Sequence, residues 1–406
     1  MLEIEDLMPS AAVHKPSTPL RFLFVKSHLA YPRSSGHDIR AFHMMRALAE
    51  LGHPVGLVTA VRPIDEAVRG SGLEFQTTLD ERSTTDERRP SLTWAQRRYA
   101  SYFGVSDRDR ALVADAANAF RADVVVGMGA DVLPYLAGSR PRKVWYAGDE
   151  WVTHYRSLVK LSRPATWRNL RTATIWGVYQ RSFVPLLERI WVVAPAEARA
   201  MRRWAGAAHV DVLSNGVDAD YFAPQAVPEQ ERAAVFWGRL DFTPNIQALA
   251  WFCKAVWPLV RARFADATFR IIGFHPGADA QALAALPGVS LIPDLADLRS
   301  AVCGHGVVAM PFQSGGGIKN KMLEAASMAR PIVCTPLACQ GLRTDPPVIV
   351  AERPQDWVDA FARLWTDAAA TTRLRQEVRA WAIREHSWRR TAADAVESLQ
   401  PVGAES

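Results

Sequence analysis

The hydrophobic residues of this chain gather in short, β-branched runs that glycine, proline or polar residues interrupt. Enough chain for a helix separates most runs, a pattern typical of strands buried on both faces of a parallel sheet. In the first half the runs are Arg21–Val25, Pro54–Ala60, Val124–Gly127, Val144–Ala147, Ile190–Ala194 and Val210–Leu213. In the second half they are Ala233–Trp237, Thr268–Gly273, Val289–Ile292, Gly306–Met310, Pro331–Thr335 and Pro347–Ala351. The pattern predicts an α/β protein with two doubly wound parallel sheets.

Turn residues and a polar stretch separate the two series of strands. Ser214-Asn-Gly-Val-Asp218 and the following residues 224–232 have the composition of a linker, which places a domain boundary near residue 225. After Asp356, apolar residues recur three and four positions apart, which predicts helices to the end of the ordered chain. We therefore expect a disordered leader over 1–19, a first domain over 20–225, a second domain over 226–370 and C-terminal helices over 371–406. Those helices either complete the second domain or brace the first.

Composition excludes several classes of protein. Of the 406 residues, 49% are hydrophobic and 22% charged, which suits a folded chain and not a disordered one. The four cysteines show no C-x-x-C spacing, so neither a disulfide framework nor a zinc site is indicated. An acidic N-terminus and the lack of a long apolar run exclude a secretory signal and a spanning helix. We expect a cytoplasmic protein whose net charge of +6 suits an anionic ligand or lipid surface.

The loops that follow the strands should hold the chemistry, because open parallel sheets bind ligands at the carboxyl ends of their strands. The loop after the first strand lacks the Gly-x-Gly-x-x-Gly pattern of dinucleotide binding. The segment Gly315-Gly-Gly-Ile-Lys-Asn-Lys321 also lacks the Gly-Lys-Ser/Thr ending of a P-loop. A phosphate group would therefore be bound by a different device.

The strongest binding signal is a glycine turn between a predicted strand and a predicted helix. Its three glycines let the backbone approach a ligand, and the helix behind them offers free N–H donors; they are Gly315, Gly316 and Gly317. Lys319 and Lys321 lie in the first helical turn, where the helix dipole disfavours cations, so they indicate a bound anion, which we predict to be a diphosphate. Glu324 lies one turn deeper on the face of Lys321, where it would accept ribose hydroxyls. The alternative is an ordinary Lys–Glu pair on a surface helix.

With Leu323-Glu-Ala and Arg330-Pro-Ile-Val333, this loop resembles the nucleotide-sugar loop of the retaining glycosyltransferases of family 4, which have the GT-B fold. Similar segments recur in the same order along residues 20–340: Gly36 with its preceding loop, Ser214–Asp218, and Trp237-Gly-Arg-Leu240. The resemblance implies two Rossmann-like domains facing an interdomain cleft. It also implies a UDP-, GDP- or dTDP-linked sugar donor and a hydroxyl acceptor. The stretch after Leu240 is similar to the transferases of bacterial exopolysaccharide clusters.

The resemblance assigns the donor diphosphate to Arg239, whose guanidinium can grip phosphate oxygens with two hydrogen bonds. Many relatives have a lysine five or six residues later, where this chain has Pro244 and Asn245. The second cation would then be Lys321 or, failing that, Lys319.

Other donor contacts follow from the same resemblance. The family's first loop glutamate falls on Gly316, which leaves Glu324 as the second and changes the expected contacts to the sugar. Ile318 lies in the same loop, and Leu295 lies near the main chain that recognises the base in relatives. The aspartates beside Leu295 would equally cap a helix beginning near Leu298.

In the first domain, the resemblance places six residues toward the acceptor and the reacting sugar. They are Ser35, Gly36, His37, Arg40, Glu150 and His154, together with Asp149, which matches a catalytic polar position. His37 and Arg40 are equally compatible with an exposed helix face.

These residues suggest a metal-free and cofactor-free reaction. Arg239, the two lysines and the helix amides would stabilise the negative charge that builds on the leaving diphosphate. The resemblance implies retention of the anomeric configuration. A GT-B epimerase or hydrolase, a soluble natural-product glycosyltransferase and a non-catalytic sugar-nucleotide sensor are the alternatives. We expect no nucleic acid partner.

Two basic, aromatic stretches of the first domain have no role in the predicted donor site. They contain Trp94, Arg97, Arg98, Tyr99, Tyr102 and Phe103, and Lys160, Arg163, Trp167, Arg168, Arg171 and Trp176. Such composition suits peripheral contact with an anionic membrane, at the inner face, where a lipid-linked glycan would be elongated. Charged helix faces over buried aromatic rings are the alternative.

Overall fold

The computed structural model describes residues 18–30, 36–61, 71–79, 91–147, 166–206, 209–315 and 317–400. The chain divides into two compact units. The first holds the described residues up to Val192, Glu197–Asp211 and the chain from Ala392, and the second holds Val193–Ala196 and Val212–Thr391. The boundary predicted near residue 225 thus lies within the second unit. The predicted leader falls outside the described residues except for Thr18 and Pro19.

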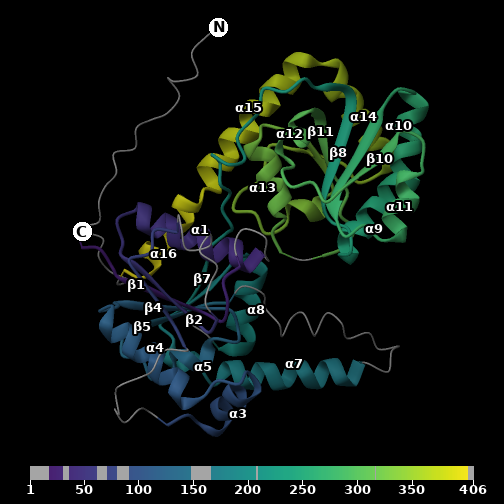
Figure 1. Ribbon diagram of the computed structural model, residues 1–406. Helices are drawn as coiled ribbons and strands as arrows, with labels where there is room; N and C mark the ends of the chain where they lie inside the picture. Colours follow the sequence, from purple (N-terminus) through teal and green to yellow (C-terminus); the bar gives the residue numbers. More distant parts are fainter. Residues whose placement is uncertain are drawn as a thin grey trace. The chain divides into compact units, whose positions relative to one another are not determined.

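The first unit is built on a seven-stranded sheet in the order β3-β2-β1-β4-β5-β6-β7 (Figure 1). The strands are β1 (Phe22–Lys26), β2 (Val55–Thr59), β3 (Phe75–Thr78), β4 (Val124–Met128), β5 (Arg142–Tyr146), β6 (Arg189–Val192) and β7 (Val210–Val212). β1 runs parallel to both neighbours, with Phe22 opposite Val55 on one side and Val124 on the other. β1 and β4 are buried along their whole length, as their continuous apolar runs predict.

β3 is the strand that the hydrophobic pattern missed. It lies at the edge of the sheet and pairs only with β2 among the described strands. Its sequence, Phe-Gln-Thr-Thr, is half-buried and carries no apolar run. An edge strand needs less apolar surface because one of its sides has no strand neighbour, so periodicity gives a weak signal there.

The helices of the first unit connect these parallel strands. They are α1 (Gly36–Glu50), α3 (Trp94–Tyr102), α4 (Asp107–Ala119), α5 (Leu133–Leu136), α7 (Thr166–Arg181), the 3₁₀ turn η2 (Val184–Leu186) and α8 (Pro195–Ala205). Two of them begin at capping boxes, in which Thr93 and Ser106 accept from the backbone N–H groups of Gln96 and Asp109. α16 (Trp388–Ser398) contributes its last residues to this unit.

The second unit has a six-stranded parallel sheet in the order β10-β9-β8-β11-β12-β13. The strands are β8 (Gln230–Arg239), β9 (Thr268–Phe274), β10 (Val289–Pro293), β11 (His305–Met310), β12 (Ile332–Cys334) and β13 (Ile349–Val350). The helices are α9 (Thr243–Trp251), η3 (Phe252–Val256), α10 (Trp257–Arg263), α11 (Ala278–Ala284), α12 (Arg299–Cys303), α13 (Asn320–Ser327), η4 (Pro336–Cys339), α14 (Pro354–Thr366) and α15 (Ala368–Glu385). Every strand that the pattern predicts is present in the two sheets.

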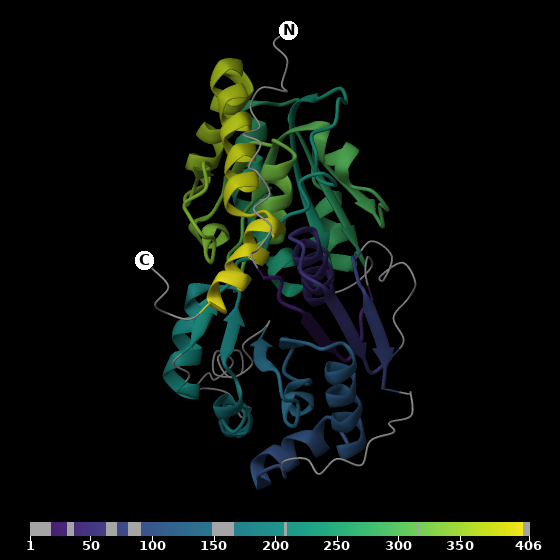
Figure 2. The ribbon, with the colours of Figure 1, turned by 90° about the vertical axis from the view of Figure 1, so that its left-hand side faces the viewer.

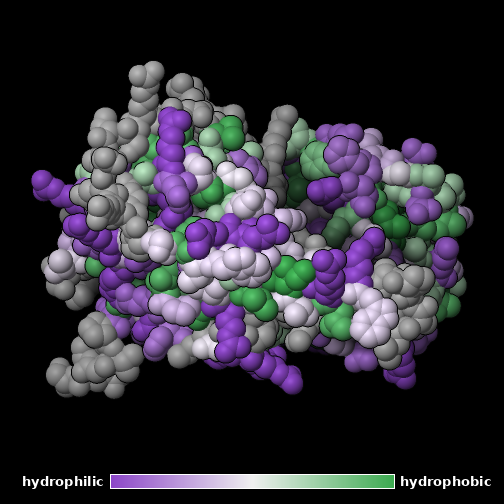
Figure 3. All heavy atoms as spheres, turned by 90° about the horizontal axis from the view of Figure 1, so that it is seen from below, coloured by the Kyte–Doolittle hydropathy of each residue, from purple (hydrophilic) through white to green (hydrophobic). Residues whose placement is uncertain are grey.

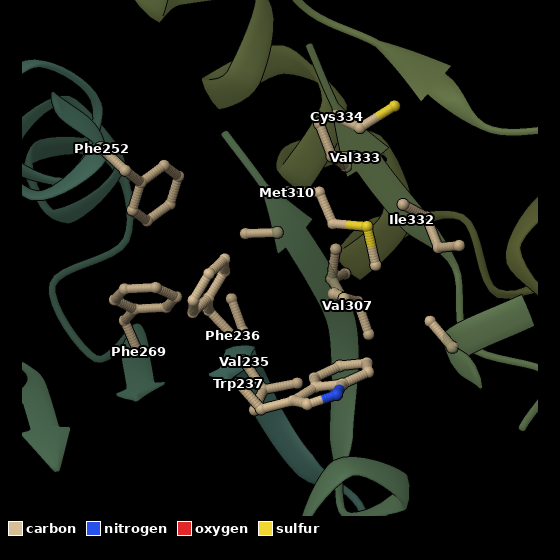
Figure 4. Packing of buried hydrophobic residues seen from close by; sticks show 14 of the residues in the cluster. Val235, Phe236, Trp237, Phe252, Phe269, Val307, Met310, Ile332, Val333 and Cys334 are labelled. Atoms are coloured by element: carbon tan, nitrogen blue, oxygen red, sulfur yellow. The ribbon is translucent and has the colours of Figure 1, made fainter. Parts of the chain in front are cut away.

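The core of the second unit holds its central strands rigidly in place. Phe236 on β8 lies with Phe252 and Phe269 (Figure 4), and the rings of Phe252 and Phe269 are 4.7 Å apart. α15 packs alongside α13 (Figure 2). There Arg379 donates a hydrogen bond to the Ser327 carbonyl. This packing fixes the strand ends and the helix from which the site is built. Within the described ranges, no helix is both long and apolar enough to cross a membrane.

Candidate active site

The candidate site lies at the carboxyl edge of the second sheet, where β8 and β11 end. The two strands are neighbours, with Val308 opposite Val235, although about 70 residues separate them in the chain. The loop after β8 carries Arg239, and the loop after β11 carries Gly315 and Gly317 before α13 begins. Gly315 and Gly317 have φ values of +100° and +70°, which favour glycine. The sheet topology therefore brings the predicted arginine and the predicted glycine turn to one edge.

Arg239 holds its guanidinium in solvent, with 68% of the side chain exposed. Its Nε donates to Asp241 Oδ1 at 3.0 Å and its Nη2 to Asp241 Oδ2 at 2.7 Å. This pairing lowers the pKa of Asp241. A carboxylate thus occupies the guanidinium fork that a phosphate would use, so an anionic ligand has to compete with Asp241 for Arg239.

Lys321 projects back from the first turn of α13 toward the end of β8. Its Nζ donates to Asn245 Oδ1 at 3.3 Å and lies 5.6 Å from the ring centres of both Phe236 and Phe312. Gly238 makes this approach feasible, because a Cβ at that position would stand 2.8 Å from Nζ. Burial lowers the pKa of Lys321 to about 8. The site therefore holds a desolvated ammonium close to the main chain of Arg239.

Asn245 connects the two cations. Its Nδ2 donates to the Arg239 carbonyl at 2.7 Å, while its Oδ1 accepts from Lys321. Only 2% of its surface is exposed. In the sequence, Pro244 and Asn245 fill the window in which the resemblance leads us to expect a lysine, and nothing there indicated an amide contact with Lys321. Asn245 supplies no charge and instead orients the charge of Lys321.

Lys319 closes the glycine turn. It is the N-cap residue of α13, and its Nζ donates to the carbonyls of Gly315 and Gly317 at 3.0 Å each. Burial and the nearby Lys321 lower its pKa to about 8. α13 has no side-chain cap on its first amides, in contrast to the capping boxes of α3 and α4. The first turn of α13 thus offers uncapped N–H donors next to two ammonium groups.

Glu324 lies one turn deeper in α13 and is half-buried. Its Oε2 accepts a hydrogen bond from the indole Nε1 of Trp237 at 2.9 Å. Burial raises its pKa, and the Trp237 hydrogen bond and Lys321 oppose that shift. Among the described residues, no hydrogen bond reaches its second oxygen, Oε1. Trp237 is a site residue that sequence analysis missed, since an aromatic residue in a buried strand gave no sign of a polar partner 87 positions away.

The remaining donor-side residues lie around this group. Ile318 is half-buried against the core, and its Cγ1 would be 3.1 Å from a Cβ at Gly341. Leu295 is half-buried after β10, two strands from β8 in the sheet. Asp297 accepts from the backbone and guanidinium of Arg299, whose helix α12 has Leu298 as its N-cap residue.

In the first unit, three predicted residues lie at the start of α1. Gly36 opens the helix, His37 is half-buried, and Arg40 is buried with its guanidinium 5.4 Å from the ring centre of Tyr146. Beside them Lys26, at the end of β1, forms a buried ion pair of 2.9 Å with Asp38. The predicted residues Ser35, Asp149, Glu150, His154 and Gly316 lie outside the described residues.

Comparison with known proteins gives a family match within the second unit. Residues 231–367 match the family model described as "Glycosyl transferases group 1". No curated protein sequence matches the chain. Among the described residues, no group of three or more His, Cys, Asp or Glu side chains is placed to hold a metal ion.

Several solved structures resemble the whole chain. HepE of Anabaena, in complex with UDP and glucose, is 12% identical with a TM-score of 0.60, over 94% of this chain and 99% of its own. A TarM variant of S. aureus, in complex with fondaparinux, alpha-GlcNAc-glycerol and UDP, is 10% identical with a TM-score of 0.65, over 94% and 100%. WaaG, a glycosyltransferase involved in lipopolysaccharide biosynthesis, is 15% identical with a TM-score of 0.57, over 92% and 99%. The likeness shows that this chain has the GT-B fold, as predicted.

Proposed function

We propose that the protein is a glycosyltransferase that moves a sugar from a nucleotide-diphosphate donor to a hydroxyl acceptor. The observation that carries the proposal is that one edge of the sheet holds Arg239 at the end of β8 and Lys319 and Lys321 at the uncapped start of α13. Glu324 lies one turn deeper in α13. The match to glycosyltransferase group 1 over the same residues supports it. The cations fit a diphosphate, and the carboxylate fits the paired hydroxyls of a ribose.

Each residue has a distinct task in binding the donor. Arg239 exchanges Asp241 for phosphate oxygens, which its planar fork can bind in pairs. Lys321 neutralises the second charge from within the loop, held by Asn245. Lys319 keeps the glycine turn closed, so that the backbone N–H groups of the turn and of α13 face the ligand. The Oε1 atom of Glu324 accepts from the ribose, while Trp237 fixes its other oxygen.

The reaction we propose uses electrostatic stabilisation. As the glycosidic bond breaks, the sugar gains oxocarbenium character and negative charge builds on the departing diphosphate. Once donor binding has moved Arg239 from Asp241 to the phosphate, two cations and a helix N-terminus stabilise that charge and lower the barrier. We propose that this cradle replaces a metal ion. The acceptor oxygen bonds to the anomeric carbon on the face that the diphosphate leaves, with retention as in family 4, and the proton of the acceptor hydroxyl passes to the departing diphosphate. Asp149 and the residues at the start of α1 are proposed to contact the transferred sugar or the acceptor.

UDP is the first nucleotide to test, because the HepE and TarM structures contain it, with GDP and dTDP in the same panel. A ligand that binds only the folded protein raises its thermal midpoint by mass action. The stabilising donor is then incubated with glycan, lipid-linked and small-molecule acceptors. For the acceptor we propose a growing exopolysaccharide. Rapid release of nucleotide from the donor without any acceptor would favour a hydrolase or epimerase instead.

Variants test the assignment of the site. Arg239→Ala and Glu324→Ala should lose sugar transfer. Both variants should stay folded, because Arg239 is exposed and Glu324 is only half-buried. Glu324→Gln retains an acceptor for Trp237 and tests the charge alone. Arg353→Ala is the matched control, since Arg353 also forms an exposed pair with an aspartate, at 2.8 Å. Unchanged turnover in both alanine variants at the site would refute the assignment.

A further inference from the structure

Helices α3 and α7 of the first unit pack against each other through aromatic rings. The ring of Trp176 on α7 lies 5.6 Å from that of Tyr99 and 5.5 Å from that of Tyr102, both on α3. Tyr99 is buried, and its hydroxyl donates to the Ala130 carbonyl. The inward-facing aromatic rings of α3 and α7 thus form a small hydrophobic cluster between the two helices.

The opposite face of α7 has no partner within the described part of the chain. Trp167, Arg171, Thr174, Val178 and Arg181 recur at intervals of four, three, four and three residues, which places them on one helix face. All five are exposed. An outward face of an ordinary surface helix carries charged and polar residues, whereas this one begins with a tryptophan and includes a valine.

The same two helices carry the most exposed large hydrophobic side chains of the described residues. Trp167 is 78% exposed, Tyr102 70% and Trp94 67%. Leu170 and Val178 on α7 are also exposed. From below (Figure 3), the side of the molecule on which Figure 1 places α3 and α7 shows hydrophobic and hydrophilic side chains interleaved. Burial of these rings would be favourable in any environment drier than water.

The charge of this surface has one sign. α3 and α7 together contain five exposed arginines, Arg97, Arg98, Arg168, Arg171 and Arg181, and neither helix contains Asp or Glu. Within the described residues none of the five forms an ion pair with a carboxylate. In contrast, several exposed arginines of the second unit have an acidic partner, as Arg239, Arg263 and Arg353 do. Their guanidinium groups can therefore pair with an external anion without displacing a carboxylate of the described chain.

We propose that this surface, formed by the exposed residues of α3 and α7, binds the headgroup region of an anionic lipid membrane. Tryptophan and tyrosine rings occupy the boundary between headgroups and acyl chains, while arginines pair with lipid phosphates beside them. Apolar and basic side chains that alternate along one helix face fit a planar surface that is both apolar and anionic, as the headgroup region is. A nucleic acid would leave Leu170 and Val178 unused, and an acidic protein would have to match an apolar stripe as well. The binding is peripheral and does not depend on the proposed glycosyl transfer.

The test is co-sedimentation of the full chain with vesicles of phosphatidylglycerol and phosphatidylcholine, against vesicles of phosphatidylcholine alone. We expect binding to the anionic vesicles at low salt and its loss at high salt or without the anionic lipid. Reversal of two charges in Arg168→Glu/Arg171→Glu should weaken binding at least about tenfold. Trp167→Ser should weaken it independently of salt.

The control is Arg373→Glu/Arg384→Glu, which makes the same change in net charge at two exposed positions of α15. It should bind vesicles like the unchanged protein, and thermal midpoints show that all variants are folded. No binding to anionic vesicles at low salt would overturn the proposal, as would an equal loss in the control. Full binding by Trp167→Ser, together with equally tight binding to polyglutamate or single-stranded DNA, would show general attraction of anions and would also overturn it.

Discussion

The close approach of Lys321 to Gly238 allows a direct test of the donor site. In Gly238→Ala, the new methyl group would stand 2.5 Å from Cε and 2.8 Å from Nζ of Lys321, and 2.9 Å from Nδ2 of Asn245. Carbon atoms do not approach other heavy atoms so closely, and Asn245 is buried and held by the Arg239 carbonyl. The end of the flexible lysine is what can move. The substitution should therefore displace the ammonium from its place between Asn245, Phe236 and Phe312.

The size of the effect follows from the contact that is lost. A hydrogen bond to a charged group contributes roughly 1.5–3 kcal/mol, and about 1.4 kcal/mol corresponds to tenfold in affinity. The Kd for UDP should thus rise about 10- to 100-fold. Gly238 also has a φ of +149°, so an alanine there carries strain of order 1–3 kcal/mol in the folded state. Stability and affinity should both fall, for separate reasons.

Calorimetric titration with UDP and chemical denaturation measure the two effects separately. Gly104→Ala is the control for strain, because Gly104 has a φ of +68° with no atom within 4 Å of the added methyl group. It should lose stability and keep donor affinity. In a Lys321→Ala background, Gly238→Ala should weaken UDP binding no further, since the displaced group is already gone. Wild-type affinity in Gly238→Ala, or a full additional loss in the double variant, would refute the reasoning.

Two further predictions concern the same site. Burial lowers the pKa of Lys319 and of Lys321 from 10.5 to about 8, so UDP affinity should fall as the pH rises through about 8, and Lys321→Arg should bind with a shallower decline. Between about pH 8 and 10.5 these lysines bind more protons in the unfolded chain than in the folded one, so the stability of the ligand-free protein should rise with pH. UDP affinity should decline over the same range. If stability and affinity fell together, the burial of both ammonium groups would be contradicted. Trp237→Phe removes the indole donor to Glu324 and should raise the Kd for UDP about tenfold with little change for inorganic diphosphate, a comparison made by calorimetry. An equal loss for both ligands would show that Trp237 acts on the whole loop and not on ribose binding.

The hydrophobic pattern predicted the strands of both sheets well, because a strand buried on both faces is a continuous apolar run in the sequence. β1 and β4 are examples, each a continuous apolar run that is buried throughout. The edge strand β3 was missed since Phe75–Thr78 has no such run. The hydrophobic pattern also could not predict where the chain divides into its two units. The segment after Val212 joins the second unit because Val217 and Ser214 are tied to His386 and Thr391 by hydrogen bonds across more than 160 residues.

The chain by itself therefore determined the α/β class, the glycine turn before α13 and the candidate residues Arg239, Lys321 and Glu324, because each of these is visible in a few neighbouring residues. Only the tertiary structure decided their partners. Asn245 reaches Lys321 across 76 residues and Trp237 reaches Glu324 across 87, since β8 and β11 are adjacent in the sheet but not in the chain. The structure also showed that Asp241 holds Arg239 and that Lys319 closes its own loop. Local sequence records which residues are buried and which are charged, whereas the pairing of those charges depends on the order in which crossover connections place the strands.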